Sequence, residues 1–505
     1  MKPVVLFENS VDAHSEQDCD CDCDCNCECS HLFLSNHEGI EYLSQESDLV
    51  LSKHLKNIPL SNDYSVFYCS SETRNSFIAV LNSSAQEFLY GFDKALKSKN
   101  SFEWLNKRYH EDEYSRTLEK IIRAGFVNII NPTQEVLEYA LPSQNTLAAW
   151  IHVTDRCNLR CSYCYLPHVR EDMSDETGRA TIDAIFRSAL TNGFKQVKIK
   201  YAGGEPLLRF PFVGELHQYA QSLAKQNNIA LNGVVLSNGT LLTAEIVETL
   251  KSLSLSLMIS LDGLGESHDR HRPYAGGRGS FADVSGAVKL ALDNGIIPNI
   301  SVTVSGRTAE SLPQLISWIL ENNLPFSLNF YRENELSASN TDMRLDEEKI
   351  INGMLAAFKV IETNLPRRSL LPALVDRANL SAPHLHTCGV GQNYLVFDQN
   401  GQVAKCQMHI RKPITNIHVE DPLAIIRADQ IGIQNLSVEE KEGCRTCEWK
   451  YWCTGGCSLA THRATGRYDV KSPNCNIYKA LYPETVRLEG LRLLKYANDP
   501  EVVLQ

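Results

Sequence analysis

The residues of this chain best suited to chemistry are three cysteines on one short segment, Cys157, Cys161 and Cys164. The apolar-rich run from 149 to 154 directly before them is typical of a strand that leads into a loop. Three thiolates on one loop can bind three irons of a [4Fe–4S] cube and leave the fourth iron open to another ligand. The pattern predicts a cluster that acts on a bound molecule, with a zinc knuckle or a structural cluster as the alternative.

Polar residues also follow the later apolar runs, at positions where strands would end. The run from 197 to 202 is followed by a glycine pair, a glutamate and a proline. Glycine lets the backbone approach a ligand closely, and a carboxylate there could pair with an ammonium group. The candidate binding residues at these ends are Gly203, Gly204, Glu205, Pro206, Ser237, Asn238 and Ser260.

The spacing C-x3-C-x2-C, with Tyr163 before the last cysteine, resembles the defining motif of radical S-adenosylmethionine (SAM) enzymes. The resemblance implies that SAM binds the open iron and is cleaved to a 5′-deoxyadenosyl radical. It assigns the Gly203–Pro206 stretch to the SAM amino group, and Ser260 and Arg272 to the SAM carboxylate. Ser237, Asn238 and Tyr163 are further expected cofactor contacts.

Short apolar runs alternate with helical patterns across residues 145–332, the expected radical SAM core. Alternation of this kind predicts parallel strands joined by right-handed crossovers. Six units are too few for a closed eight-stranded barrel, so the expected fold class is α/β, a partial (β/α)6 TIM-like barrel. All the motifs fall at carboxyl ends of strands, where such folds place active sites. The predicted strands centre on Ile151, Ile199, Val235, Ile259, Val302 and Leu328.

A second cysteine array lies in residues 385–480, and its order resembles the SPASM extension of peptide- and protein-modifying radical SAM enzymes. Zinc is the alternative, but seven cysteines do not divide into groups of four. The resemblance implies two auxiliary clusters. One would be held by Cys444, Cys447, Cys453 and Cys475, and the other by Cys388, Cys406 and Cys457. Sulfatase-maturing relatives have a further cysteine where this chain has Tyr394, so the second auxiliary cluster would keep an open iron.

The residue after Cys406 departs from the sulfatase-maturing pattern. Those relatives carry an aspartate there, their proposed base, whereas this chain has Gln407, then Met408 and His409. Glutamine cannot take up a proton at neutral pH, so formylglycine formation is disfavoured unless His409 substitutes. The bridge at 333–384 is expected to be mainly helical, and residues 481–505 are expected to contain a closing helix from Pro483 to Tyr496.

Residues 60–135 form a predicted small domain of different character. From Tyr64 to Pro132 the order of elements is β-β-α-α-α-β, which resembles the winged-helix element that recognises leader peptides of ribosomally made, modified peptides. Such elements bind by adding the peptide as a strand to a sheet edge. A DNA-binding winged helix and a structural cap are the alternatives.

Residues 1–34 are predicted to be a solvated, disordered tail, because cysteine alternates with acidic residues from Asp18 to Cys29 and no hydrophobic face results. The thiolates could bind soft metals, serve a redox or cluster-delivery role, or mimic a cysteine-rich substrate. A tolerated tail without function is the remaining alternative.

Composition narrows the class of partner. A net charge of −12 without a long basic block argues against a nucleic-acid partner. No apolar stretch is long enough to span a membrane, and the apolar start is too short for a signal peptide. Cysteines in cluster spacings without an export signal indicate a reducing cytoplasm.

The sequence therefore predicts a cytoplasmic radical SAM/SPASM enzyme with three [4Fe–4S] clusters and SAM. Its expected substrate is a ribosomal precursor peptide or small protein, and its expected electron donor a flavodoxin or ferredoxin. Thioether or carbon–carbon crosslinking is the favoured outcome. Peptide epimerisation and protein-residue oxidation are alternatives, and a non-catalytic iron–sulfur electron carrier is the alternative of another class.

Overall fold

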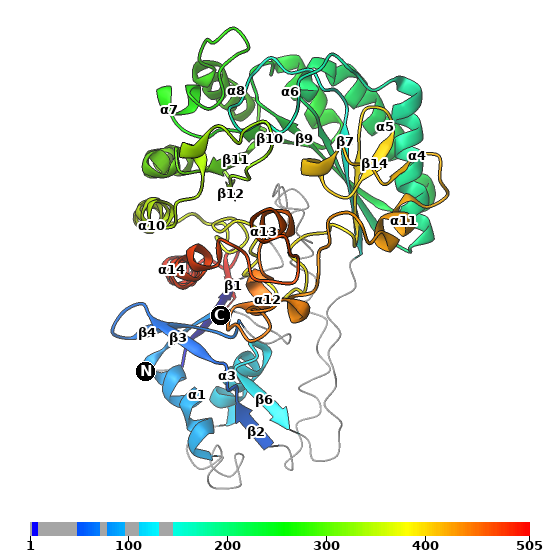
Figure 1. Cartoon of the computed structure of the whole chain (residues 1–505). Helices are drawn as coiled ribbons and strands as arrows, with labels where there is room; N and C mark the ends of the chain where they lie inside the picture. The colour runs from blue at the N-terminus through cyan, green and yellow to red at the C-terminus, as the bar shows by residue number, and fades with distance from the viewer. Residues whose placement is uncertain (1–2, 9–47, 71–77, 96–110, 131–144, 505) are drawn as a thin grey trace.

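The structure is a computed structural model that describes residues 3–8, 48–70, 78–95, 111–130 and 145–504 (Figure 1). The largest element in this part of the chain is a sheet of nine strands in the order β12-β11-β10-β9-β8-β7-β13-β14-β15. Its six strands from β7 to β12 are all parallel. They are β7 (Thr146–His152), β8 (Gln196–Ala202), β9 (Ala230–Ser237), β10 (Leu255–Ser260), β11 (Asn299–Val304) and β12 (Phe326–Phe330). Each contains one of the predicted centres, so the partial (β/α)6 barrel is confirmed.

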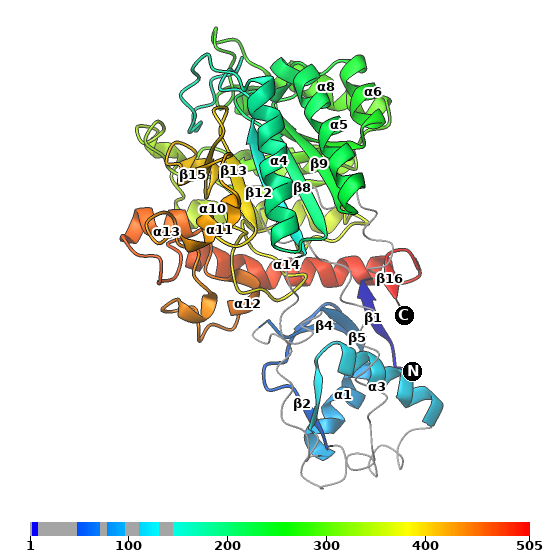
Figure 2. The same ribbon diagram turned by 90° about the vertical axis from the view of Figure 1, so that its right-hand side faces the viewer.

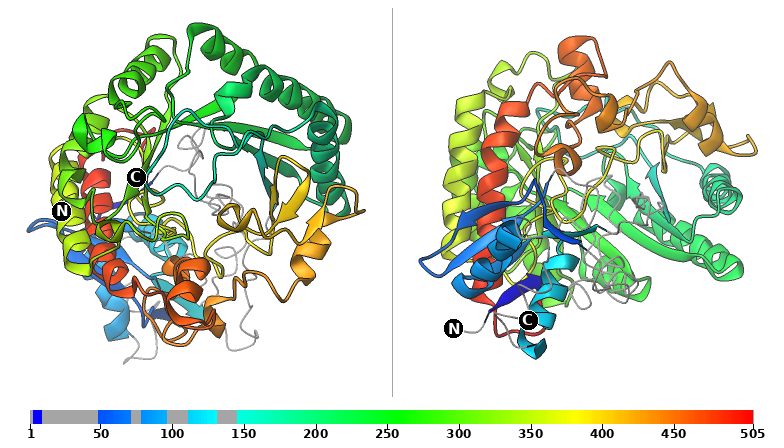
Figure 3. Two further views of the ribbon diagram at one scale, coloured as in Figure 1. Left: turned by 45° about the horizontal axis from the view of Figure 1, so that its top comes forward. Right: turned by 90° about the horizontal axis from the view of Figure 1, so that it is seen from below.

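Helices cover the outer face of these strands, and the whole forms an open ring (Figure 3). Side-chain caps fix where two of them begin, because Ser174 accepts from the Thr177 N–H and Asp346 from the Lys349 N–H. The main helices are α4 (Asp175–Thr191), α5 (Phe210–Asn227), α6 (Ala244–Ser252), α8 (Phe281–Asp293), α9 (Leu312–Glu321) and α10 (Glu347–Thr363). Short turns of helix join them: η2 (Pro206–Arg209), α7 (Glu266–Asp269), η3 (Ala309–Ser311) and η4 (Thr341–Met343).

The second cysteine array is attached to the open side of the barrel. Strand β13 (Tyr394–Phe397) pairs in parallel with β7, and β14 (Gln402–Ala404) and β15 (Thr415–Asn416) continue the sheet in antiparallel fashion. The remaining elements are η5 (Gln407–His409), α11 (Pro422–Ala428), η6 (Val438–Glu440), α12 (Lys450–Cys453) and α13 (Ser458–Thr465). Because β13 extends the barrel sheet, this region and the core are joined by one continuous hydrogen-bonded sheet.

Two elements of the carboxyl-terminal half differ from expectation. The bridge at 333–384 is helical mainly in α10, and the chain from 364 to 393 runs without helix. The last long helix, α14 (Cys475–Lys495), begins eight residues before the predicted start at Pro483, which lies inside it. Proline is common in the first turn of a helix, which is why the sequence suggested that start. In the structure the helix already begins at the last cysteine of the array.

The amino-terminal unit is a sheet of five strands in the described part of the chain, ordered β16-β1-β5-β4-β3. Its strands are β1 (Val5–Glu8), β3 (Lys56–Pro59), β4 (Tyr64–Tyr68), β5 (Ala79–Asn82) and β16 (Val503–Leu504), with helices α1 (Ser83–Ala95) and α3 (Glu111–Arg123). A separate pair joins β2 (Asp48–Leu51) to β6 (Val127–Ile130). The second of the three helices expected between Tyr64 and Pro132, at residues 102–109, lies outside the described residues, as does the Asp18–Cys29 repeat.

This unit uses more of the chain than residues 60–135. Residues 5–8, assigned to a tail by the sequence, form β1 between β16 and β5. The four apolar residues in a row from Val4 to Phe7 fit either a strand or a short buried segment. Their partners near residues 80 and 503 lie far away in the sequence, so no local pattern could reveal the pairing.

Both faces of this sheet are buried, by different partners. Leu6, Val66 and Val80 belong to the main core, whereas Val5, Phe67 and Leu81 pack with α1 and α3. Figure 2 shows α14 running between the barrel and this sheet. A Cβ on Gly490 of α14 would lie 2.8 Å from Val66 Cβ, so the helix approaches the sheet closely only because this position is glycine.

Aromatic stacking attaches the same sheet to the cysteine region. The ring of Tyr68 stacks on Trp449 at 5.3 Å between centroids, and on Trp452 at 5.9 Å. Ser70 Oγ donates to the Glu448 carbonyl at 2.7 Å. The amino-terminal unit is therefore packed against the segment that carries Cys444, Cys447 and Cys453.

None of the described helices is long and apolar enough to cross a membrane.

We expect the substitution Leu6→Ala to lower the free energy of unfolding by about 2–5 kcal/mol, because Leu6 is 1% exposed and its removal leaves a cavity beneath α14. Urea unfolding of the purified variant measures this. The exposed Lys53→Ala is the matched control and should change it by less than about 0.5 kcal/mol. An equally small effect of Leu6→Ala would mean that β1 does not stabilise the amino-terminal sheet.

Candidate active site

A cavity of about 260 Å³ opens at the carboxyl ends of the parallel strands. Every one of the six strands contributes to its wall. The contributing side chains are Trp150 from β7, Ala202 from β8, Leu236 and Ser237 from β9, Met258 and Ser260 from β10, Ser301 and Thr303 from β11, and Asn329 and Phe330 from β12. This is the end of a parallel α/β sheet at which ligands bind.

Cys157, Cys161 and Cys164 all line this cavity. Their loop is fixed by backbone hydrogen bonds to the segment after α7, where Arg160 N–H donates to the Pro273 carbonyl and Ser162 N–H to the His271 carbonyl, both at 2.8 Å. Side-chain amides of Asn334 and Asn340 bind the carbonyls of Tyr163 and Ser162. The three thiols are therefore presented on a backbone that is bound at several points.

These thiols are suited to a cluster rather than to one ion. Within the described residues, no three His, Cys, Asp or Glu side chains are close enough to share a single metal ion. A cubane does not require that, because each cysteine binds a different iron. Burial raises the pKa of Cys157 and of Cys164 to about 12, so binding of iron would displace a proton from each thiol. The donor set fits a [4Fe–4S] cluster with one open iron.

The glycine pair of the predicted binding stretch brings β8 against the cysteine loop. Gly203 has φ +148°, and a Cβ there would lie 2.4 Å from the Thr154 carbonyl oxygen; at Gly204 it would lie 2.2 Å from the Arg156 oxygen. Gly204 N–H donates to the Thr154 carbonyl at 2.7 Å. Only glycine permits this contact, and both glycines line the cavity.

Glu205 and Pro206 are not among the described residues that line the cavity. The Glu205 side chain is fully buried and its carboxylate accepts three hydrogen bonds from protein: Leu207 N–H at 3.0 Å, Ser237 Oγ–H at 2.7 Å and Asn238 N–H at 2.8 Å. Burial raises its pKa, and these three donors oppose the rise. The carboxylate thus joins the ends of β8 and β9, whereas the sequence suggested a contact with the SAM amino group.

Arg272, Tyr163 and Ser260 all line the cavity, as does Asn238. The Tyr163 hydroxyl hydrogen-bonds both Asp262 and Arg272, and Arg272 Nη1 lies 3.4 Å from Asp262 Oδ2. Burial works to raise the pKa of Asp262, but Arg272 and Tyr163 hold it below its ordinary value. Asp262 is therefore an anion that fixes Arg272, whose Nε has no hydrogen-bond partner within the described residues.

The second array divides into two groups in space. Cys444, Cys447, Cys453 and Cys475 line one small cavity beside Trp449, Tyr478 and Tyr482. The other three pack against the apolar cluster that also contacts Cys164 of the barrel loop. These are Cys388, Cys406 and Cys457, the set that the sequence assigned to the second auxiliary cluster.

Tyr394, where sulfatase-maturing relatives have a cysteine, is fully buried, and its hydroxyl donates to Gln407 Oε1 at 3.2 Å. Gln407 and Met408 line the barrel cavity. His409 is not among the described lining residues, and burial lowers its pKa to about 4. His409 is therefore neutral at pH 7 and lies outside the described lining of the cavity.

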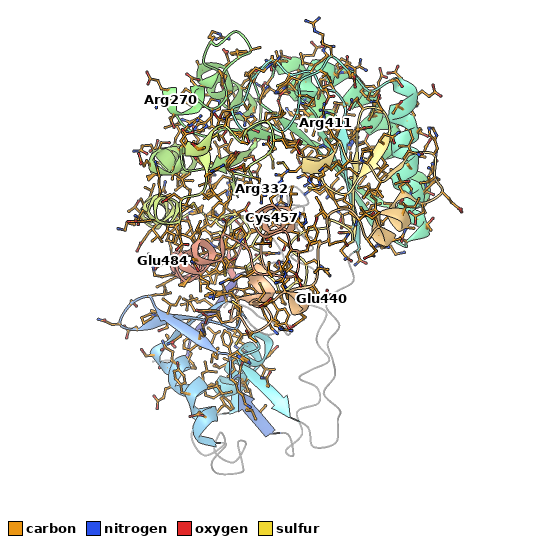
Figure 4. All side chains as sticks on the ribbon, in the orientation of Figure 1. Arg270, Arg332, Arg411, Glu440, Cys457 and Glu484 are labelled. Atoms are coloured by element: carbon orange, nitrogen blue, oxygen red, sulfur yellow. The ribbon has the colours of Figure 1, made fainter. Side chains whose placement is uncertain are left out.

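Buried cations accompany the cysteines of the second array. Lys441 is 1% exposed and donates to the Thr454 carbonyl at 2.8 Å, between Cys444 and Cys388. Burial lowers its pKa, while those thiols raise it. Burial also raises the pKa of Cys457, but Arg332 and Arg377 more than offset this and lower it. In Figure 4 the labelled Arg332 and Cys457 lie in the middle of the molecule, between the barrel and the carboxyl-terminal helices.

The polar residues of the cavity that sequence reasoning missed include three basic ones, His168, Arg332 and Arg377. Arg332 comes two residues after β12, so the rule that drew attention to the other strand ends could have found it. His168 and Arg377 lie in irregular segments with φ +56° and +58°, where no local pattern announces them.

The family comparison decides what this cavity belongs to. Residues 151–319, which hold the cysteine loop and Arg272, match the family described as the radical SAM superfamily. This is a radical SAM domain, and the chain that carries it is an enzyme. SAM and a [4Fe–4S] cluster are its cofactors.

Relatives of the radical SAM domain include enzymes of different activity. A Methanocaldococcus jannaschii protein of unassigned function is 31% identical over 34% of this chain and 57% of its own length. The Fe-coproporphyrin III synthase of Methanosarcina barkeri is 24% identical over 65% of this chain and 87% of its own. The serine-type anaerobic sulfatase-maturating enzyme of Klebsiella aerogenes is 23% identical over 68% of this chain and 87% of its own.

The fold has a solved counterpart that extends beyond the radical SAM domain. Native anSMEcpe with bound AdoMet and Cp18Cys peptide superposes with a TM-score of 0.55 at 20% identity, over 70% of this chain and 99% of that one. The superposed part, 70% of this chain, is longer than the stretch 151–319 that matches the radical SAM family.

We expect His268→Gln to reduce the pH dependence of stability. His268 Nδ1 accepts from the Asp262 N–H at 3.3 Å, and burial lowers its pKa from 6.5 to about 4. Between these values the unfolded chain binds a proton that the folded chain does not, so stability falls as the pH drops. At pH 5 the loss is about 2 kcal/mol.

Glutamine can donate and accept at the same position without titrating. The urea midpoint of the variant should therefore fall less than that of the wild type between pH 7 and pH 5. An equal fall in both proteins would contradict the assignment of a neutral His268.

Proposed function

We propose that this radical SAM enzyme is a maturase that modifies a ribosomally made peptide between two cysteine sites. The observation that carries the proposal is the position of the cavity. One wall holds Cys157, Cys161 and Cys164, and another holds Gln407 and Arg332, next to Cys406 and Cys457 of the second array. A substrate in this cavity lies beside both sites at once.

The roles of individual residues follow from this placement. When bound, SAM and its cluster supply a 5′-deoxyadenosyl radical that can abstract a hydrogen atom from the substrate. The cysteine loop holds the cluster, and Gly203 and Gly204 let backbone approach the cofactor. Arg272, fixed by Asp262 and Tyr163, is suited to the SAM carboxylate, because a guanidinium binds carboxylates in a planar fork. Glu205 acts indirectly, because its carboxylate holds Ser237 and Asn238 in place at the cavity wall.

The amino-terminal unit is proposed to recognise the peptide. Strand β3 is the last strand on one side of its sheet within the described residues, and its side chains are largely exposed. An extended peptide can add to such an edge as a further strand. Because the opposite faces of the sheet are covered by α14 and by α1 with α3, the edge is the surface left for a partner.

Thioether or carbon–carbon crosslinking is the outcome we favour. The position of the missing fourth cysteine holds Tyr394, and Gln407 stands where a base would be. An open iron in the second auxiliary cluster would be a soft Lewis acid suited to a substrate thiolate. Protein-residue oxidation lacks its base in this chain, and epimerisation makes no use of a thiol partner. An electron donor such as flavodoxin or ferredoxin is the further partner.

Metal content tests the three-cluster arrangement. We expect anaerobically reconstituted protein to hold about twelve irons, and the triple change of Cys157, Cys161 and Cys164 to Ala to remove about four of them together with SAM cleavage. The six cysteines of the tail are changed to serine in every sample so that they do not bind iron. Cys69→Ala, a buried cysteine outside both arrays, is the control and should leave iron unchanged. Zinc in place of iron would refute the proposal.

Mass spectrometry of the cognate peptide after turnover tests the bond formed. We expect a loss of two hydrogen atoms and one cysteine that no longer reacts with an alkylating agent, because sulfur has become bonded to carbon. Turnover in D2O supplies the contrast. If the peptide mass is unchanged in ordinary water and rises by one deuterium in D2O, the reaction is epimerisation and not crosslinking.

A further inference from the structure

The cavity of the radical SAM domain is positively charged in a protein that is strongly negative overall. Its lining contains Arg272, Arg332 and Arg377, and no aspartate or glutamate among the described residues. The chain as a whole carries a net charge of −12. A concave site lined by one sign of charge concentrates ligands of the other sign. The positive charge of the cavity lining is therefore specific to this site, since the chain as a whole is negatively charged.

Arg272 is accounted for by Asp262 and the cofactor, which leaves two arginines on the far wall. Arg332 Nη2 lies 2.9 Å from both carboxylate oxygens of Asp376, and Nη1 donates to the Phe330 carbonyl at 2.7 Å. Its Nε has no hydrogen-bond partner within the described residues, and the side chain is 12% exposed. Arg332 is thus held rigidly at the cavity, with its guanidinium group also against the Cys457 thiol.

Arg377 follows Asp376 in the chain and reaches the same wall. Its φ of +58° turns the backbone so that both Asp376 and Arg377 contribute to this region. Asp376 also accepts from the Phe330 N–H at 3.0 Å and from the Tyr478 hydroxyl at 3.3 Å, so its carboxylate is fully engaged. Arg332 and Arg377 therefore both line this wall of the cavity, and both lie near Cys457.

We propose that Arg332 and Arg377 select an acidic peptide, by binding a carboxylate side chain next to the cysteine that reacts. This proposal rests on the proposed function and specifies its substrate class. Guanidinium is the side-chain cation best matched to a carboxylate, because its planar fork can donate two parallel hydrogen bonds. A substrate bound in this way has its acidic residue at the far wall and its neighbouring thiol close to Cys406 and Cys457.

The chain itself contains a sequence with this chemistry. From Asp18 to Cys29 every cysteine has acidic or amide neighbours, and the segment lies outside the described residues. It supplies the design of a probe: a blocked pentapeptide, Gly-Asp-Cys-Asp-Gly, and its isosteric partner with both aspartates replaced by asparagine. The single cysteine limits removal of iron from the enzyme by the probe.

The experiment compares the Kd of the two pentapeptides for the anaerobically reconstituted full chain with SAM bound, by titration calorimetry. We expect the acidic peptide to bind at least about tenfold more tightly, and the difference to shrink as salt is raised. Arg377→Gln and Arg332→Gln should each remove most of the difference, and Arg332→Lys should restore part of it. Arg270→Gln changes an exposed arginine on the outer rim of the barrel (Figure 4) and should leave the difference intact. Iron content shows that each variant keeps its clusters.

Equal affinity for the two peptides would overturn the proposal, and would mean that the two arginines serve the auxiliary cluster alone. The same result in the wild type and in Arg377→Gln would overturn it as well. Release of 5′-deoxyadenosine in the same samples separates this from the proposed function. Release without any preference for the acidic peptide refutes only the substrate class, whereas absence of release with every peptide refutes the maturase.

Discussion

The constraint on which the rest of this structure depends is that ten cysteine thiols, the proposed cluster ligands, would have to become thiolates within the folded protein. Burial opposes a negative charge, and the pKa of Cys157, Cys164 and Cys444 is raised to about 12 for that reason. Iron stabilises each thiolate only after it has bound. The fold must therefore present the thiols together and place compensating cations close to them before any cluster is present.

The compensating cations also form ion pairs or hydrogen bonds with other parts of the fold. Arg272 is held by Asp262 at the end of β10, Arg332 by Asp376 after β12, and Lys441 by a backbone carbonyl between the two cysteine groups. Each is oriented by an anion or a carbonyl that is itself buried, so the cation cannot turn away from the thiols. The same arginines give the cavity its positive wall, which links cluster assembly to the choice of substrate.

The sequence predicted what local pattern determines. Six strands and their carboxyl-end motifs follow from short-range regularities, and the strands appear where expected. The grouping of the cysteines came from the resemblance to the SPASM extension. Three features depend on contacts far apart in the chain. Strand β1 pairs with residues near both 80 and 503, Glu205 turns into the protein rather than toward the cavity, and Arg377 reaches the wall through a left-handed residue. None of these has a signature within a window of a dozen residues.

Helix α14 links the amino-terminal sheet, which we propose recognises the peptide, to a cysteine site that is distant from it in the sequence. Cys475 is its first residue, where the partial positive charge of a helix amino terminus favours a thiolate. Twenty-one residues carry the helix about 30 Å from that point. Along the way Gly490 admits the sheet of β1, β5 and β4 into direct contact. A rigid helix therefore connects Cys475 to the sheet on which we propose that a peptide binds. The distance between the proposed recognition site and the cysteine site is set by this helix and not by a flexible linker.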